Sequence, residues 1–380
     1  MHLPSYLRSS VEIIKLYTGA IPFAAWLKDY FRQHKKFGSK DRKFVSDLCY
    51  CYYRLGRSFN QNSVEERFLI AQFLCHADSV FIKELKPEWA EYLSLPLNEK
   101  VNFFSDDKTR IFPLTDELSN EIDKDLFDQS HLVQPDLFLR IRPGKKQTAI
   151  KKLENAFILF SAEEDCLRLT NATKVEEVLK LDEEVVVQDK SSQQVLNLLK
   201  ERLKLSSFTA WDCCATSGGK TILLHDHFPK VQLTVSDIRE SILHNLKNRL
   251  KRAGIHNYQS FVADVSSFQF ELKKKFDVII CDAPCSGSGT WGRTPEQLSF
   301  FSKDKIDPYS SLQKSIALNA SKRLKDGGLF LYITCSVFKK ENEEVVRYIV
   351  EKTNLQLVKE QYFKGYTEKA DTLFAALFSL

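Results

Sequence analysis

The chain has 380 residues, of which 43% are hydrophobic and 28% are charged, and its formal net charge is +5. This composition is typical of a globular protein with two or three domains, and no stretch approaches the ~18 uncharged apolar residues that a membrane span needs. The amino terminus has no apolar segment typical of a signal peptide, and nine cysteines, two of them adjacent, do not form a disulfide framework. We therefore expect a cytoplasmic protein and a monomer. Cys281 and Cys285 have the spacing of a zinc-ligand pair, but no second pair answers them, so no metal is expected.

Residues 1–130 predict an all-helical domain. Apolar residues between 41 and 57 recur at helical spacing, and Ser63 with Glu66 is the signature of a helix start. A polar break falls at residues 106–108. The first sixty residues hold eleven Lys or Arg against four Asp or Glu, with Tyr and Phe among them. This pattern indicates either a contact with nucleic acid or a solvated helix face, and taken alone it leaves both open.

Residues 131–180 predict a small α/β module of different character. The pattern favours a strand at residues 137–141, a helix at residues 145–155 and a second strand at residues 157–160. The third and largest predicted part covers residues 181–380.

From residue 208 onward, short apolar runs alternate with helical patterns. The strands are expected at residues 209–213, 232–235, 260–263, 278–281 and 329–333. The helices between them include residues 240–253 and residues 310–324, the second of which Gly327 and Gly328 are expected to close. Such alternation predicts βαβ units with right-handed crossovers and a parallel, doubly wound sheet. The predicted fold class is therefore α/β, with a helical domain and a small module preceding the sheet.

Residues 212–221, Asp-Cys-Cys-Ala-Thr-Ser-Gly-Gly-Lys-Thr, lie between the first of these strands and its helix. Small residues there let the backbone approach a ligand, and the helix that follows offers unpaired N–H groups. The stretch nearly spells a phosphate-binding P-loop, but Cys214 stands where that motif needs glycine. Asp237 and Asp264 follow the second and third strands, and each alone is typical of a turn or a helix cap. Together the three strand ends predict a site for an adenosyl ligand, in which Asp237 accepts from the ribose hydroxyls.

Two thiols complete the pattern. Asp282 and Cys285 come directly after a buried strand, where open α/β sheets bind their ligands. Cys335 ends the fifth strand, which is the neighbour of the fourth in the usual doubly wound order. A single cysteine at such a place is usually a packing residue, whereas two on adjacent strands indicate thiolate chemistry.

These motifs, in this order, resemble the Sun-type (Fmu/RsmB-like) RNA cytosine-5 methyltransferases, which use S-adenosylmethionine. The resemblance covers residues 131–380, and the pairing of Pro-Cys at 284–285 with Thr-Cys at 334–335 is its most specific part. The helical region is similar to the NusB-like RNA-binding domain of the bacterial ribosomal RNA branch. The chain departs from the family at Thr216-Ser217, where Ala-Pro is usual, and at Thr372-Leu373, where Gly-Phe is usual.

The resemblance implies a Rossmann-like methyltransferase sheet and a covalent mechanism. In that mechanism Cys335 is the nucleophile that adds to carbon 6 of cytosine, and Cys285 assists release of the methylated product. Asp282 would hold the polar edge of the pyrimidine, with Lys220 nearby. The implied cofactor contacts come from Cys214, Ala215, Thr216, Ser217, Gly218, Gly219, Lys220, Asp237, Asp264 and Asp282. The implied partner is RNA, with 16S ribosomal RNA favoured and transfer RNA as the alternative.

Three other functions stay open at this point. A DNA cytosine methyltransferase would use Cys285 as its nucleophile and would not need Cys335. A P-loop nucleotide hydrolase would bind ATP or GTP with magnesium. A non-enzymatic RNA-binding protein would keep the fold but would not bind S-adenosylmethionine measurably.

Overall fold

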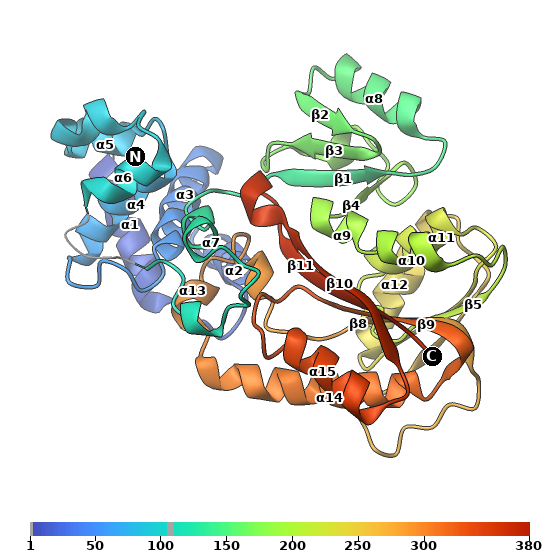
Figure 1. Ribbon diagram of the computed structural model, residues 1–380. Coiled ribbons are helices and arrows are strands. Elements are labelled where there is room, and N and C mark those ends of the chain that lie inside the picture. Colours follow the sequence, from blue (N-terminus) through green and yellow to red (C-terminus); the bar gives the residue numbers. More distant parts are fainter. Residues whose placement is uncertain (1–2, 105–109) are drawn as a thin grey trace. The chain divides into compact units, whose positions relative to one another are not determined.

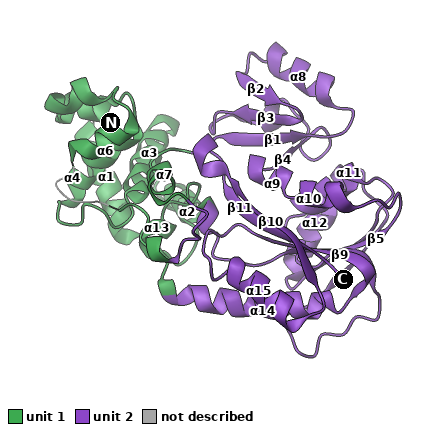
Figure 2. Ribbon diagram, in the orientation of Figure 1, with its two compact units in different colours: residues 1–116, 123–134, 290–303 green, residues 117–122, 135–289, 304–380 purple. Residues whose placement is uncertain are grey.

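The computed structural model describes residues 3–104 and 110–380 (Figure 1), so the predicted polar break at residues 106–108 lies outside the described residues. The chain divides into two compact units, each assembled from separate stretches of sequence (Figure 2). Unit 1 comprises residues 1–116, 123–134 and 290–303, and unit 2 comprises residues 117–122, 135–289 and 304–380. None of the described helices combines the length and the apolar character that crossing a membrane requires.

Unit 1 is built from helices. They are α1 Leu3–Leu16, α2 Phe23–Gln33, α3 Ser39–Arg54, α4 Val64–Cys75, α5 Val80–Leu85, α6 Leu97–Phe103, α7 Lys124–Ser130 and α13 Gln297–Phe300. Helix α4 forms the centre of the unit, because its residues from Arg67 to Leu74 are all buried. The predicted helix start is confirmed: the Ser63 hydroxyl accepts a hydrogen bond from the backbone N–H of Glu66 at 3.2 Å, a cap that is usually worth about 1 kcal/mol.

Unit 2 begins with a small four-stranded antiparallel sheet in the order β2-β3-β1-β4. Its elements are β1 Leu137–Ile141, α8 Lys146–Asn155, β2 Phe160–Glu163, β3 Cys166–Leu169 and β4 Val185–Val187. Leu139, Leu153 and Leu167 are fully buried in its core, where α8 packs against the sheet. The strand at residues 137–141 and the helix after it therefore form as the sequence predicts.

The predicted strand at residues 157–160 is wrong. Helix α8 ends in a left-handed turn at Phe157, whose φ is 54°, and the N–H of Ile158 reaches back to the carbonyl of Leu153 at 3.0 Å. This arrangement closes a helix end, and it leaves Phe157 and Leu159 almost fully exposed. The strand begins only at Phe160, because the three residues before it form the turn that ends helix α8.

The large sheet of unit 2 has seven strands in the order β10-β11-β9-β8-β5-β6-β7. They are β5 Thr209–Asp212, β6 Gln232–Asp237, β7 Tyr258–Val262, β8 Phe276–Asp282, β9 Leu324–Thr334, β10 Gln356–Lys364 and β11 Thr372–Ser379. Strands β5 to β9 pair in parallel, and β11 runs antiparallel to both of its neighbours. The chain order reverses between β5 and β8, and open α/β sheets bind ligands at the carboxyl edge of such a reversal.

Helices cover both faces of this sheet. They are α9 Lys190–Gln194, α10 Asn197–Arg202, α11 Gly219–His227, α12 Glu240–Arg252, α14 Ile306–Ser321 and α15 Glu343–Lys352. Figure 1 shows α10, α11 and α12 on one side and α14 and α15 on the other. Fully buried residues of the central strands, such as Ile280 and Leu331, pack between these layers, and each contributes about 1.5–3 kcal/mol by leaving water. The predicted α/β class with a Rossmann-like sheet is confirmed.

Gly327 and Gly328 do not close a helix, so that prediction is wrong. Helix α14 already ends at Ser321, and both glycines lie inside β9. There the register against β8 shifts, since Phe276 pairs with Leu324 but Val278 pairs with Leu329. Gly327 has a φ of 72°, and a Cβ on Gly328 would lie 3.0 Å from the carbonyl oxygen of Asp277. The glycines therefore form part of a β-bulge, after which β9 continues to pair with β8.

Candidate active site

A cavity of about 530 Å³ opens in unit 2 where the parallel strands end. Of the predicted site residues, it is lined by Cys214, Thr216, Lys220, Asp237, Asp264, Asp282, Cys285 and Cys335. The other four do not line it, namely Ala215, Ser217, Gly218 and Gly219. The structure thus brings the two cysteines and the three strand-end carboxylates to one edge of the sheet, as the strand order requires.

Reasoning from sequence missed the apolar side of this cavity, which is formed by Ile238, Val265, Leu312 and Ile316. Two signals could have found part of it. Ile238 directly follows the strand-end Asp237 and is 59% exposed, although it is a large apolar residue. Leu312 and Ile316 are four residues apart on α14 and so share a helix face.

The loop between β5 and α11 turns sharply beside the cavity. Thr216 and Gly218 both have positive φ, 43° and 83°, and a Cβ on Gly218 would lie 2.1 Å from the side chain of Leu246. The N–H of Ala215 donates to the carbonyl of Ser236 at 2.9 Å, which holds the loop against β6. Residues 215 and 218–219 therefore shape the loop, although they do not face the cavity.

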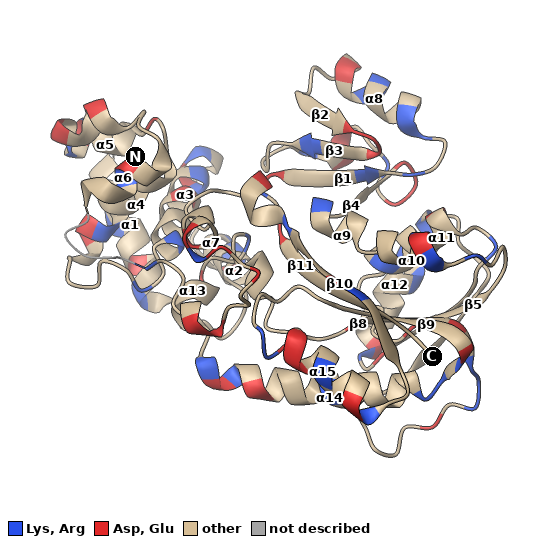
Figure 3. Cartoon of the chain, viewed as in Figure 1, with Lys and Arg blue, Asp and Glu red and all other residues tan. Residues whose placement is uncertain are grey.

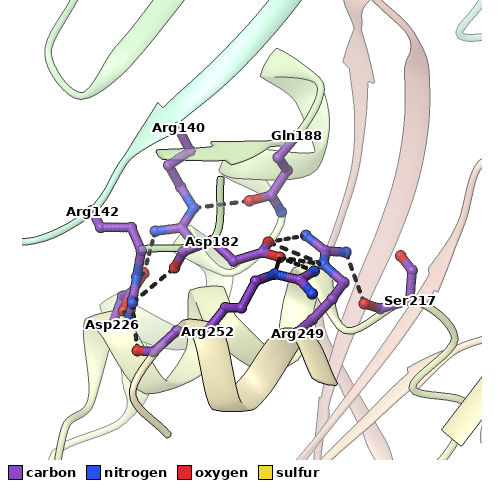
Figure 4. Close-up of polar contacts among 9 residues, drawn as sticks. Arg140, Arg142, Asp182, Gln188, Ser217, Asp226, Arg249 and Arg252 are labelled. Atoms are coloured by element: carbon purple, nitrogen blue, oxygen red, sulfur yellow. Dashed lines mark hydrogen bonds and ion pairs between the residues drawn. The ribbon is translucent and has the colours of Figure 1, made fainter. Parts of the chain in front are cut away.

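A buried polar network holds the same loop from the side of the small sheet (Figure 4). Arg249 of α12 donates to the carbonyl of Ser217 at 2.7 Å and also to the carboxylate of Asp182, which Arg252 contacts as well. Burial acts to raise the pKa of Asp182, but the hydrogen bonds and charges of the two arginines outweigh it and hold that pKa below its usual value. Asp182 is only 3% exposed, so this ion pair is a rigid support for the loop.

A second carboxylate in Figure 4 joins the small sheet to α11. Asp226 accepts hydrogen bonds from Arg140 and from Arg142, each at 2.6 Å, and its side chain is 3% exposed. Arg140 also donates to Gln188, which follows β4. Breaking such a pair by removing one partner leaves a buried charge uncompensated, so these contacts connect the small sheet firmly to the large one.

Asp237 ends β6 with its carboxylate held by backbone groups. One oxygen accepts the N–H of Thr216 at 3.2 Å, and the other accepts the N–H of Arg239 at 3.0 Å. The guanidinium of Arg239 also donates to that second oxygen at 3.3 Å, so the oxygen that accepts from Thr216 is the one that keeps a lone pair for a ligand. Asp264 is different, because its Oδ1 accepts from the backbone and the hydroxyl of Ser266 and thereby closes a turn. Asp237 is thus the more firmly positioned of the two acceptors.

Lys220 and Asp282 form an ion pair with a distance of 2.7 Å between Nζ and Oδ2. Burial acts to lower the pKa of Lys220, but the charge and hydrogen bond of Asp282 outweigh it, so the pKa is raised. Nearby, the Thr221 hydroxyl donates to Asp212 at 2.6 Å, and burial raises the pKa of Asp212 to about 7. The Lys and the Thr of the near-P-loop sequence are therefore both engaged by carboxylates of the protein.

The two thiols are in contact, with 3.3 Å between the Sγ atoms of Cys285 and Cys335. The hydrogen bond to Cys335 is the largest cause that raises the pKa of Cys285 well above its ordinary value, and burial adds to it. Either sulfur can act as the donor in this contact. The two thiols and the Lys220–Asp282 ion pair line the same cavity.

Glu341 is a site residue that the sequence reasoning missed. It is fully buried, and its Oε2 accepts from the N–H of Ser286 and from Gln313, each at 2.9 Å. Its Oε1 accepts from the hydroxyl of Ser336 at 2.8 Å. Ser286 and Ser336 each follow one of the cysteines directly, so a single carboxylate holds both thiol-bearing loops in place.

The fold and this site define an α/β protein with a pocket at the sheet's switch point and two thiols at its inner end. The family described as 16S rRNA methyltransferase RsmB/F matches residues 202–374. Over this segment, which is less than half of the chain, the predicted resemblance is confirmed.

Two curated relatives are similar over part of the chain. The Ribosomal RNA small subunit methyltransferase B of Xanthomonas campestris pv. campestris is 30% identical over 194 residues, which are 50% of this chain and 43% of that relative. The Ribosomal RNA small subunit methyltransferase F of Pectobacterium carotovorum subsp. carotovorum is 29% identical over 220 residues, which are 57% of this chain and 44% of that relative. The matches thus span less than half of the length of these relatives.

Solved structures show the same fold. The crystal structure of PH0851 matches with a TM-score of 0.75 and 20% identity, covering 100% of this chain and 99% of that one. NSun6 from Pyrococcus horikoshii, solved with SFG, matches with a TM-score of 0.60 and 15% identity, covering 70% of this chain and 96% of that one. At these identities the likeness concerns the fold alone.

Proposed function

We propose that this protein methylates carbon 5 of a cytosine in RNA, with S-adenosylmethionine as the methyl donor and 16S ribosomal RNA as the substrate. The observation that carries the proposal is the contact between Cys285 and Cys335 at the inner end of the strand-end pocket. In this proposal residues 1–130 bind RNA, residues 131–180 form the small module, and residues 181–380 carry the chemistry. The protein would act in the cytoplasm.

The pocket suits an adenosyl cofactor. Asp237 keeps a lone pair on Oδ2 for a ribose hydroxyl, and the apolar side at Ile238 and Ile316 suits a purine ring. Asp282 adds negative charge, which complements a cationic ligand, although Lys220 offsets part of it. S-adenosylmethionine, when bound, supplies an electrophilic methyl group. The residues that would hold it are Cys214, Thr216 and Lys220 of the loop after β5, together with Asp237, Asp264 and Asp282.

The two thiols divide the covalent chemistry. Carbon 5 of cytosine is too weak a nucleophile to accept a methyl group directly, and addition of the Cys335 thiolate to carbon 6 would turn the ring into an enamine-like nucleophile. After methylation, the proton on carbon 5 must leave as the sulfur–carbon 6 bond breaks. Once Cys335 is bonded to the base its sulfur is a neutral thioether, so the thiol–thiol contact, which is the largest cause of the raised pKa of Cys285, is lost. Cys285 is then better able to take part in the elimination.

Two alternatives fit the geometry less well. In a P-loop hydrolase Lys220 and Thr221 would serve phosphate and magnesium, but here both are engaged by Asp282 and Asp212. A DNA cytosine methyltransferase would need Cys285 as its nucleophile and would leave the contact between Cys285 and Cys335 without a role. Transfer RNA is the second candidate substrate. Bisulfite sequencing of total RNA from cells with and without the gene tests the proposal. Loss of a methylated cytosine in 16S RNA supports it, and loss only in transfer RNA favours the second substrate. No loss in any RNA contradicts it.

Glu341→Gln should slow methyl transfer by about tenfold or more while leaving S-adenosylmethionine affinity unchanged. A glutamine side chain has one acceptor oxygen where the carboxylate has two. If its amide nitrogen replaces Oε2, both Ser286 and Gln313 lose their acceptor, and if it replaces Oε1, Ser336 loses its acceptor. Single-turnover kinetics and calorimetry measure the two effects separately. A parallel loss of rate and cofactor affinity would mean that Glu341 merely stabilises the fold.

Reversing the charge of Lys35, Lys36 and Lys43 to Glu should weaken RNA binding and flatten its dependence on salt, because phosphate contacts release counterions. These three residues are exposed: Lys35 and Lys36 lie in the turn after α2, and Lys43 lies on α3, where Figure 3 draws Lys and Arg in blue. The measurement is RNA affinity at several salt concentrations, with S-adenosylmethionine affinity as the control. Unchanged RNA affinity at low salt would show that the basic run is only a solvated face.

A further inference from the structure

A second group of reactive side chains lies in unit 1, remote in sequence from the cavity residues. Asp47 and Cys51 are four residues apart on α3 and therefore lie on the same face of that helix. Cys75 is the last residue of α4, and His76 follows it as the C-cap. Two helices thus present an Asp, a His and two Cys residues to one another. These are the side chains that bind zinc in proteins.

The ligand atoms converge. His76 Nε2 is 3.0 Å from Asp47 Oδ2 and 3.3 Å from Cys51 Sγ, and the three atoms all lie within 4.8 Å of one another. The thiol of Cys75 hydrogen-bonds to that of Cys51. Bonds of ~2.0–2.3 Å to a single tetrahedral ion would place two ligand atoms roughly 3.3–3.7 Å apart. The side chains of Asp47, Cys51 and His76 could therefore surround one zinc ion, and Cys75, which does not belong to the converging group, would have to turn toward them to become the fourth ligand.

The cluster holds protons that a metal ion would replace. His76 Nε2 carries at most one proton, which it can donate to Asp47, while Cys51 hydrogen-bonds to Cys75. Zinc binding would release the protons of the two thiols and of Nε2, because thiolate sulfur and an unprotonated imidazole nitrogen are its ligands.

The surroundings fit a bound ion held as part of the structure. Cys51 is buried, whereas the side chains of His76 and Asp47 are 33% and 44% exposed, so an ion can enter from solvent. Gln72 donates to Asp47 at 2.9 Å, and Lys100 donates to the carbonyl of His76 at 2.6 Å. These outer contacts orient one ligand and anchor the backbone of another, as the partners of metal ligands commonly do.

We propose that Asp47, Cys51, Cys75 and His76 bind one zinc ion that ties α3 to the end of α4. Cysteine and histidine ligands favour zinc over magnesium or calcium, which prefer oxygen. With four protein ligands the site is closed, so the ion stabilises the helical unit and takes no part in the chemistry at Cys335. The site is independent of the proposed methyl transfer.

The test begins with the untagged full-length chain, purified from cells grown with added zinc and analysed by elemental mass spectrometry. We expect about one zinc per chain, together with a thiolate-to-metal absorption band after exchange for cobalt. Cys51→Ser and His76→Ala should each weaken zinc affinity by at least about 100-fold, since losing a direct ligand costs more than losing an outer contact. Cys49→Ser is the matched control, because Cys49 is a buried thiol on the same helix that does not belong to the cluster, and it should keep the zinc.

The unmodified chain decides the matter even if a variant fails to fold. A chain that carries no zinc and takes up none in a titration would overturn the proposal. A Cys51→Ser variant with unchanged zinc content would overturn it as well, as would a disulfide between Cys51 and Cys75 in the freshly isolated protein.

Discussion

Cys335→Ala should abolish methyl transfer, by more than about 10³-fold, and should also abolish any covalent complex with RNA, because no thiolate remains to add to carbon 6. Cys285→Ala should have the opposite signature. Addition and methylation stay possible without Cys285, but elimination stalls, so a covalent protein–RNA complex should accumulate. The two sulfurs are 3.3 Å apart, and each variant removes one member of this contacting pair and leaves the other in place. The two variants therefore test the roles of the two cysteines separately.

The measurement is a denaturing gel of each variant after incubation with RNA and S-adenosylmethionine. A slowly migrating band with Cys285→Ala and none with Cys335→Ala supports the assignment. The matched control is Cys281→Ser, since Cys281 is a buried thiol at the end of β8 that does not line the cavity. The reverse pattern would make Cys285 the nucleophile, and full activity in both variants would remove the covalent mechanism altogether.

Asp237→Ala should weaken S-adenosylmethionine binding by about tenfold or more, which corresponds to about 1.4 kcal/mol. The carboxylate is already positioned by the N–H groups of Thr216 and Arg239 and by the Arg239 side chain, so the remaining lone pair of Oδ2 is available to the ribose without further ordering. Asp237→Asn keeps one acceptor oxygen and should fall between the alanine variant and the unmodified chain. Calorimetry with the purified chain measures all three affinities.

Loss of Asp237 also frees the N–H of Thr216, so a control must show that the sheet itself is intact. Asp277→Asn serves this purpose, because Asp277 lies near the amino end of β8 and accepts from Thr209 and Lys325. That variant should bind S-adenosylmethionine normally. Equal affinity of Asp237→Ala and the unmodified chain would remove Asp237 from the cofactor site.

Much of the large sheet could be predicted from local pattern. The strands β5, β6, β8 and β9 carry short apolar runs buried on both faces, and the helices between them have clear apolar periodicity. The last two strands of the sheet, β10 and β11, were not predicted. β11 is apolar from Leu373 to Phe378 and nearly every residue of it is buried, but an apolar run of that length fits a buried helix equally well until its pairing partner is known.

The candidate site was predictable to the extent that it depends on strand ends. Parallel strands in a doubly wound sheet bring their carboxyl ends to one edge, so the positions of Asp237, Asp282 and Cys335 after their strands already imply that they meet. Glu341 has no such signal. Its role depends on Ser286 and Ser336, which lie 55 and 5 residues away from it and belong to different loops.

The sequence by itself determined the kind of sheet, the order of its motifs and the residue types at its edge, because hydrophobic periodicity and the chemistry of side chains are local properties of the chain. Only the tertiary structure decided which groups touch. It placed the sulfurs of Cys285 and Cys335 in contact, engaged Lys220 with Asp282, and gathered Asp47, Cys51 and His76 from two helices. Contacts between residues far apart in the chain depend on strand order, register and helix packing, and these are set by the burial of the whole core rather than by any one segment.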